Sequence, residues 1–307
     1  MKKIIQLLTI LMMVSGLAFA QQGLPDKVKE DCTTVKSSGC IDWENGIIYA
    51  SGLGVPNPAH KDNPAQSRYG AKLAAEKNAE VQLLQMIQGI NISSTTTVKD
   101  GMLESQVINS SIQGTLYRVE NYGPPREMND GSVWVTKRMH LKDIRKTLLD
   151  NGMFESGSGS GSSNSGFVQE SAGKDKVEPV PEPILPKSPE YGGSPDKIYS
   201  GLIIDARDSG VVPAMSPKIY APDGKEVYGS QIVERDFVLQ YGIAGYSKEL
   251  DDAKSNDRVK GNPLLIKAEL RPGKTSDLTI SSEDAELLKQ LESSQSFMRE
   301  ARVLIVL

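Results

Sequence analysis

Residues 50–92 read ASGLGVPNPAHKDNPAQSRYGAKLAAEKNAEVQLLQMIQGINI, and this stretch decides the fold of the first half of the chain. It begins at the end of a short predicted strand, continues through a Pro/Asn-rich break and becomes Ala-rich at about residue 64. Apolar residues in that segment recur at steps of three or four, which predicts one buried helix face over Ala71, Ala75, Ala79, Leu83, Met86, Ile87 and Ile90. Small residues early in this face allow the helix to lie close to a sheet. An ordinary core helix explains the pattern without a ligand.

The segments around this helix predict a compact α+β domain over residues 41–153, in which one helix packs on an antiparallel sheet as a strand-helix-meander sandwich. Asn45-Gly46 supplies the positive φ angles of a two-residue hairpin turn. Residues 92–98, 107–119 and 132–141 predict three further strands, with a turn at 99–101. Residues 142–151 predict a closing helix that stops at Gly152.

Gly52 and Gly54 could suggest a nucleotide-binding loop. The third glycine of that fingerprint is missing, and prolines at 56, 58 and 64 replace the direct strand-to-helix turn. The pattern therefore does not favour phosphate binding.

The N-terminus predicts a signal peptide over residues 1–20. Lys2 and Lys3 precede an apolar run that ends in Ala18-Phe19-Ala20, a small-x-small cleavage pattern. A membrane anchor is the competing interpretation, but the apolar run is shorter than the ~20 residues that a span needs. We expect an exported protein in the periplasm or at the outer membrane, with no transmembrane span in the mature chain. The formal charge of −4 and the absence of a basic cluster argue against nucleic acid as a partner.

The chain has two cysteines, Cys32 and Cys40, within the N-terminal segment 21–40. In an oxidising compartment this spacing favours a disulfide that closes a small loop. A metal site would need more ligands, and the Cys-x-x-Cys spacing of redox pairs is absent.

Small-residue patterns give residues 41–150 a family resemblance. Gly52-Leu53-Gly54, the Ala-rich helix and Gly89-Ile90-Asn91-Ile92 before a Thr/Val-rich segment resemble the LPP20 lipoprotein domain. Related domains occur in the flagellar basal-disk protein and the flagellar T-ring protein. The resemblance implies a non-enzymatic envelope module that forms rings or associates with outer-membrane structures. Unlike the lipoprotein members, this chain has no cysteine at the predicted cleavage point for a lipid.

Residues 154–196 are predicted to be a tether, because a Gly/Ser run at 157–163 is followed by five prolines within 177–189. Pro-x-x-Pro spacing there could serve peptide recognition but is common in linkers.

Residues 197–307 predict a second domain, β-rich and of the mixed α+β class. We expect strands at 198–207, 264–270 and 301–307, and a hairpin around Pro222-Asp223-Gly224. Ser281 or Ser282 with Asp284 predicts a helix cap, and the last strand is expected mid-sheet. This half is similar to the tail of other envelope proteins that carry an LPP20-type domain.

Candidate chemistry in this second domain centres on Asp205, Arg207 and Asp208, which follow a predicted strand. The carboxylates could do acid-base work, but a structural Asp-Arg pair is the favoured interpretation.

Two metal patterns are weaker. The regular spacing and central glycine of a calcium loop are missing from Asp251, Asp252, Asn256 and Asp257. His60 and His140 are too few for a histidine site. No cofactor is expected.

Two function hypotheses follow. The first is a non-enzymatic, exported cell-envelope protein that self-associates or binds protein partners, linked to the outer-membrane or flagellar apparatus. The second is a periplasmic ligand-binding protein or hydrolase that uses Asp205 and Arg207. Trp134 and Tyr122 could also stack on a glycan, although aromatic residues more often pack in cores.

Overall fold

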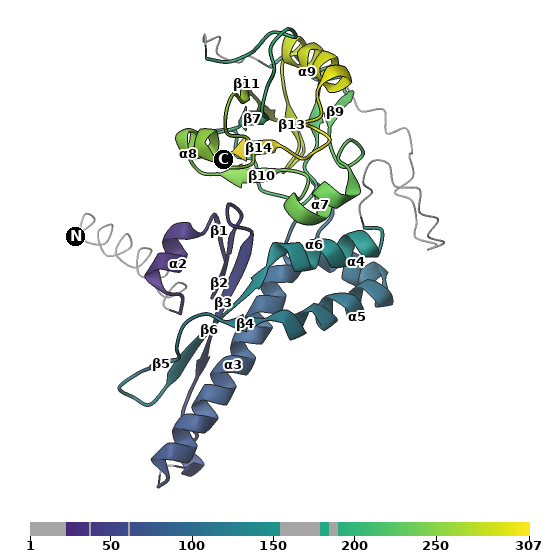
Figure 1. Cartoon of the computed structure of the whole chain (residues 1–307). Coiled ribbons are helices and arrows are strands. Elements are labelled where there is room, and N and C mark those ends of the chain that lie inside the picture. The colour runs from purple at the N-terminus through teal and green to yellow at the C-terminus, as the bar shows by residue number, and fades with distance from the viewer. Residues whose placement is uncertain (1–22, 37, 61, 154–178, 184–189) are drawn as a thin grey trace, which may run out of the picture. The chain divides into compact units, whose positions relative to one another are not determined.

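The computed structural model describes residues 23–36, 38–60, 62–153, 179–183 and 190–307 (Figure 1). The predicted signal peptide, the Gly/Ser run and part of the proline-rich segment lie outside the described residues. Contacts divide the chain into two compact units, and each is described by itself: Met1–Gly89 with Gln113–Asp143, and Ile90–Ile112 with Ile144–Leu307. The predicted domain boundaries at 153 and 197 stay predictions.

The first unit contains an antiparallel sheet with the strand order β1-β2-β3-β6-β4, and β5 also pairs with β6. Its strands are β1 (Thr34–Lys36), β2 (Gly39–Asp42), β3 (Ile47–Gly54), β4 (Glu120–Asn121), β5 (Arg126–Glu127) and β6 (Val133–His140). Short helical segments accompany them: α2 (Asp26–Asp31), η1 (Pro58–His60) and η2 (Leu116–Arg118). The predicted strand at 132–141 is confirmed as β6.

The long helix α3 (Pro64–Gln88) packs against β3 and β6 (Figure 1). Asn63 caps it by accepting a hydrogen bond from the Gln66 amide at 3.1 Å, and Pro64 occupies its first turn. The predicted helix face is confirmed from Ala71 to Ile87, whereas Ile90 is buried but lies beyond the end of the helix. The two glycines of β3 explain the close approach, because a Cβ on Gly54 would lie 1.8 Å from the carbonyl oxygen of Ala71. Gly52 and Gly54 are therefore packing residues.

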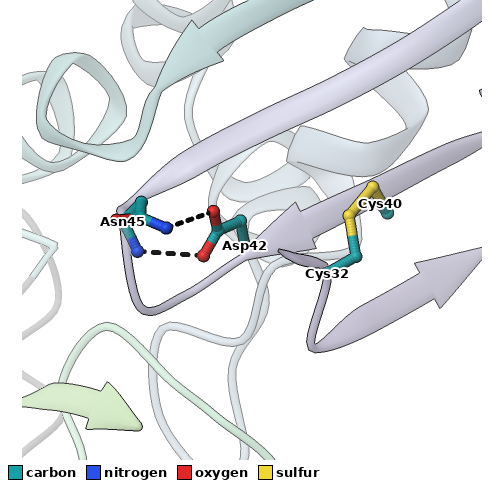
Figure 2. Close-up of a disulfide and its surroundings, with 4 residues drawn as sticks. All are labelled: Cys32, Cys40, Asp42 and Asn45. Carbon is teal, nitrogen blue, oxygen red and sulfur yellow. Dashed lines mark hydrogen bonds between the residues drawn. A yellow bond between two sulfur atoms is a disulfide. The ribbon is translucent and has the colours of Figure 1, made fainter. Parts of the chain in front are cut away.

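The hairpin at Asn45-Gly46 is confirmed, but its turn is longer than predicted. Asp42 pairs with Ile47, so four residues form the loop instead of two. Gly46 has φ +65°, and the Asp42 carboxylate accepts hydrogen bonds from the Asn45 backbone amide at 2.9 Å and from its Nδ2 at 2.8 Å (Figure 2). These side-chain bonds stabilise the wider loop in place of the tight two-residue turn.

Two of the predicted strands were wrong. Residues predicted as a turn at 99–101 lie inside helix α4 (Val98–Glu104), and most of the predicted strand 107–119 forms helix α5 (Gln106–Thr115). Thr97 and Asp100 form a reciprocal capping box at the start of α4, and a local side-chain bond of this kind favours a helix over a turn. In place of the strand predicted at 92–98, Asn91 forms isolated bridges with Thr97 and with Ala214. The meander of the predicted fold is correspondingly incomplete.

The second unit contains two sheets. A parallel sheet has the order β10-β14-β7-β11, and a smaller mixed sheet has the order β12-β13-β8-β9. Their strands are β7 (Leu202–Asp205), β8 (Ile219–Tyr220), β9 (Glu226–Tyr228), β10 (Gly245–Ser247), β11 (Leu264–Lys267), β12 (Glu269–Leu270), β13 (Leu278–Thr279) and β14 (Val303–Val306). The predicted hairpin is confirmed as β8–β9, and the terminal strand lies mid-sheet as predicted.

Helices of this unit include α7 (Arg235–Tyr241), α8 (Leu250–Ser255) and α9 (Ser282–Ser294), and α6 (Leu141–Asp150) matches the predicted closing helix. Ser281 is the N-cap of α9 and accepts from the Asp284 amide at 3.0 Å, which confirms one of the two predicted caps. The backbone of Asn91 accepts a hydrogen bond from Met215 at 2.9 Å, so residues near 91 join this unit.

The α+β class is confirmed for the chain as described. Among the described helices, none combines the length and the apolar character that crossing a membrane requires.

Candidate functional site

Asp205 occupies the position in the second unit where ligands most often bind in parallel sheets. It ends β7, an interior strand of the parallel sheet, and the carboxyl ends of such strands form the usual binding edge. Lys267 ends the neighbouring strand β11 in register with Asp205. Asp205 is nevertheless completely buried, with 0% of its surface exposed.

Donors surround the Asp205 carboxylate. Arg207 binds it in a bidentate manner, from Nε to Oδ1 at 2.9 Å and from Nη2 to Oδ2 at 2.8 Å, and the Arg207 backbone amide adds a bond at 3.2 Å. The Tyr191 hydroxyl donates to Oδ2 at 2.6 Å, and Lys267 Nζ lies 3.3 Å from the same oxygen. Two carboxylate oxygens therefore receive contacts from three side chains and one amide.

These contacts set the protonation state of the cluster. Burial alone would raise the pKa of Asp205, but the hydrogen bonds from Arg207, Tyr191 and Lys267 outweigh it and hold the pKa well below its usual range. The hydrogen bond to Asp205 raises the pKa of Arg207. Burial, together with the bond to Asp205, raises the pKa of the Tyr191 phenol. An ionised carboxylate whose oxygens are both engaged is poorly suited to exchange protons with a substrate.

Two members of this cluster were not predicted. Tyr191 comes from the segment assigned to the tether, and Lys267 comes from a separate strand. A signal for Lys267 was present, because Leu202–Asp205 and Leu264–Lys267 each place a charge after three apolar residues. Parallel pairing brings those two ends together. Asp208, the third predicted residue, is exposed with φ +66° in the turn after the strand.

The predicted disulfide is present between Cys32 and Cys40, whose Cα atoms lie 5.9 Å apart (Figure 2). It joins the residue after α2 to strand β2. The pair packs in a small core with Leu24, Val28 and Tyr49. We assign it a structural role, because it fastens the N-terminal segment to the sheet.

The aromatic residues proposed for glycan stacking are engaged in packing. Trp134 on β6 is half-buried, and a Cβ on Gly23 would lie 2.4 Å from its ring. Tyr122 makes an edge-to-face contact with Tyr49 at 5.1 Å between ring centroids, and the Arg138 guanidinium lies 5.9 Å from the Tyr122 ring. At least one face of Trp134 is therefore covered by the chain itself.

Neither metal pattern of the sequence is assembled in the part of the chain that the structure describes. A group of three or more His, Cys, Asp or Glu side chains that could hold a metal does not occur among the described residues. Asp257 pairs with Lys260, and Asp251 lies 4.0 Å from Lys254. His140 pairs with Ile47, the first residue of β3, whereas His60 ends the short helix η1, beyond the other end of that strand.

Comparison with known proteins relates the second half of the chain to a described family. Residues 201–307 match the family model described as the second domain of Treponema pallidum Tp0624. No curated protein matches the chain. The second half is therefore similar to that Treponema domain, and the matched range contains Asp205, Arg207 and Lys267 but not Tyr191.

Proposed function

We propose that this protein is a non-enzymatic component of the cell envelope that works through contacts with other proteins, including further copies of itself. The predicted signal peptide and the resemblance of residues 41–150 to the LPP20 domain support this proposal. The same resemblance supports a location in the periplasm or at the outer membrane, and a link to the flagellar apparatus belongs to the proposal as well. The similarity of residues 201–307 to a Treponema protein domain is compatible with it.

The observation that carries the proposal is the outward surface of α3. Tyr69, Leu73 and Val81 are 63%, 43% and 53% exposed. Together with Lys77 they follow one another at steps of four, so they form one stripe along the helix, which we call the α3 stripe. The opposite face of α3 is packed on the sheet, so the apolar side chains of the stripe are not needed for the core of this unit. Exposed apolar side chains grouped on one face of a helix in this way, with Lys77 between Leu73 and Val81, support a role in protein contact.

The alternative, a hydrolase or ligand-binding protein that uses Asp205 and Arg207, receives less support. The Asp205 carboxylate is buried, ionised and fully engaged by its own chain. A general acid or base needs a pKa near the working pH and access to the substrate. Asp205 has neither property, so we favour the protein-contact function.

In-cell crosslinking of an affinity-tagged mature protein tests this function. We expect recovery of the protein itself and of outer-membrane or flagellar components. The double variant Tyr69→Ser, Leu73→Ser removes two apolar side chains of the α3 stripe and should reduce the recovered partners at least tenfold. Lys72→Gln, at an exposed polar position of the same helix outside the α3 stripe, is the matched control and should leave recovery unchanged. A strictly monomeric protein that fractionates without envelope material would refute the proposal.

A further inference from the structure

The proline-rich segment contributes a docked peptide to the second unit. Residues 179–183 read Pro-Val-Pro-Glu-Pro, and the Val180 amide donates a hydrogen bond to the carbonyl oxygen of Pro222 at 2.8 Å. Pro222 lies in the turn between β8 and β9. A segment predicted as part of a tether thus forms a main-chain bond with a hairpin that follows it by about forty residues.

A side chain of the same segment binds the start of α9. One carboxylate oxygen of Glu182 accepts from the Ser282 amide at 2.7 Å, and the other accepts from the Ser282 hydroxyl at 2.5 Å. The first amides of a helix have no partner within the helix, and a carboxylate there is stabilised by the helix dipole. Ser281 satisfies the Asp284 amide, whereas Glu182 reaches the Ser282 amide from a position 100 residues earlier in the chain.

The sequence of the segment prepares it for this contact. Prolines alternate with Val180 and Glu182, and a residue that precedes proline avoids the helical region of the backbone. The segment is therefore extended before it docks, so docking costs little conformational entropy. The hydrogen bonds from Ser282 lower the pKa of Glu182, which keeps the carboxylate charged at neutral pH. Charged acceptors make stronger hydrogen bonds than neutral ones.

A second anchor lies a few residues further along. The Gly192 amide donates to the carbonyl oxygen of Leu265 at 2.8 Å, and the Tyr191 hydroxyl donates to Asp205. Glu190 also pairs with Lys254. The chain is thus attached to the second unit both before and after residues 184–189.

We propose that residues 179–183 are a strap, a peptide ligand of the second unit that is bound in cis. The start of α9 and the β8–β9 turn form its binding surface, which takes an extended peptide with glutamate between prolines. The Asp205 cluster binds Tyr191 and so attaches the chain to the second unit again, beyond the strap. Residues 179–183 and 190–192, which the sequence places in the predicted tether, therefore belong to the second unit.

Hydrogen exchange of the full mature chain, resolved to single amides, tests the strap. We expect the Val180 and Ser282 amides to be protected in the wild type, and Glu182→Ala to raise both exchange rates about tenfold. The Asp284 amide, capped by Ser281, is the internal reference and should keep its rate. Glu283→Ala, which removes an exposed carboxylate of the same turn, is the matched control and should leave Val180 protected.

Two results would overturn the strap. One is a Val180 amide that exchanges in the wild type as fast as in an unstructured peptide. The other is unchanged protection of both amides in Glu182→Ala.

A peptide added in trans tests the binding surface separately. A synthetic peptide of residues 177–187, added at about millimolar concentration to the Glu182→Ala chain, should restore protection of the Ser282 amide, since a short tether supplies effective concentrations of this order. The same peptide carrying Glu182→Gln should restore less. Failure of the unmodified peptide to protect Ser282 would overturn the proposed surface.

Discussion

Replacing Gly54 with alanine tests the packing of α3 on the sheet of the first unit. Gly54 lies on β3, and a Cβ there would come within 1.8 Å of the Ala71 carbonyl oxygen and 2.6 Å of the Ala75 amide nitrogen. Both atoms belong to the helix backbone, so no side-chain rotation can relieve the clash. The helix must move away from the strand by more than an ångström.

The loss of folding free energy follows from the contacts that this movement opens. Ala71 and Ala75 are fully buried against Val133 and Val135 of β6, and these contacts open when the helix shifts. Overpacking a well-filled core costs about 1–3 kcal/mol, and more where backbone must move. We therefore expect Gly54→Ala to lower the free energy of unfolding of the first unit by about 3 kcal/mol or more.

Tryptophan fluorescence during urea unfolding measures this loss directly. Both tryptophans of the chain, Trp43 and Trp134, lie in the first unit, so their signal reports on it. With a urea dependence of about 1–3 kcal/mol per molar, the midpoint should fall by about 1–3 M. The matched control is Gly70→Ala on α3, where a Cβ meets open space and should stabilise by about 0.5–1 kcal/mol. An unchanged midpoint for Gly54→Ala, or an equal loss for Gly70→Ala, would refute the packing argument.

Three further predictions concern single groups. Asp205→Asn should lower the stability of the second unit by about 2–4 kcal/mol at pH 7, measured by circular dichroism in urea, because it breaks a buried ion pair. Since the folded pKa of Asp205 is lowered, its contribution is present above pH ~4 and is lost as the pH falls further, and the variant should lack that loss. Burial raises the pKa of Asp277, so the folded state retains a proton that the unfolded state releases. The stability of the second unit should therefore fall as the pH rises above ~4, and Asp277→Asn should abolish this part of the pH dependence. Cys32→Ser with Cys40→Ser should cost about 2–3 kcal/mol in the fluorescence-detected unfolding, because the bridge closes a short loop.

Each of these predictions has a contradicting outcome. If Asp205→Asn is as stable as the wild type at pH 7, the structural role assigned to the Asp205 cluster is wrong. Parallel pH profiles of wild type and Asp277→Asn would mean that Asp277 titrates normally in the fold. For the cysteines, two free thiols in the intact mass of the unreduced mature protein would disprove the disulfide.

Elements that depend on local pattern were predicted well. The buried face of α3, the strand β6 and the closing helix α6 follow from periodicity alone. The cap of α9 by Ser281 and the hairpin at Pro222-Asp223-Gly224 follow from turn and cap chemistry. In each case the deciding interactions lie within a few residues of one another, so the sequence carries the information.

Prediction failed where two periodicities competed. Residues 107–119 alternate in a manner typical of a strand, yet Ile108 and Ile112, four residues apart, are the ones fully buried in α5. Thr97 and Asp100 carried a capping signal that the β-branched composition of the segment concealed. The helix forms because residues four apart share one helix side, so both isoleucines are buried together. The strand preference of the alternating residues does not outweigh that burial.

The chain by itself determined the α+β class, the packing face of α3, the cysteine pair and the position of the terminal strand. The tertiary structure alone decided the partners of Asp205, because Tyr191 and Lys267 reach it from segments 14 and 62 residues away. It also decided that Glu182 caps α9 and that Gly52 and Gly54 serve packing. These contacts depend on which strands pair and in what register, and that choice is made by burying apolar surface across the whole unit, not by any local pattern.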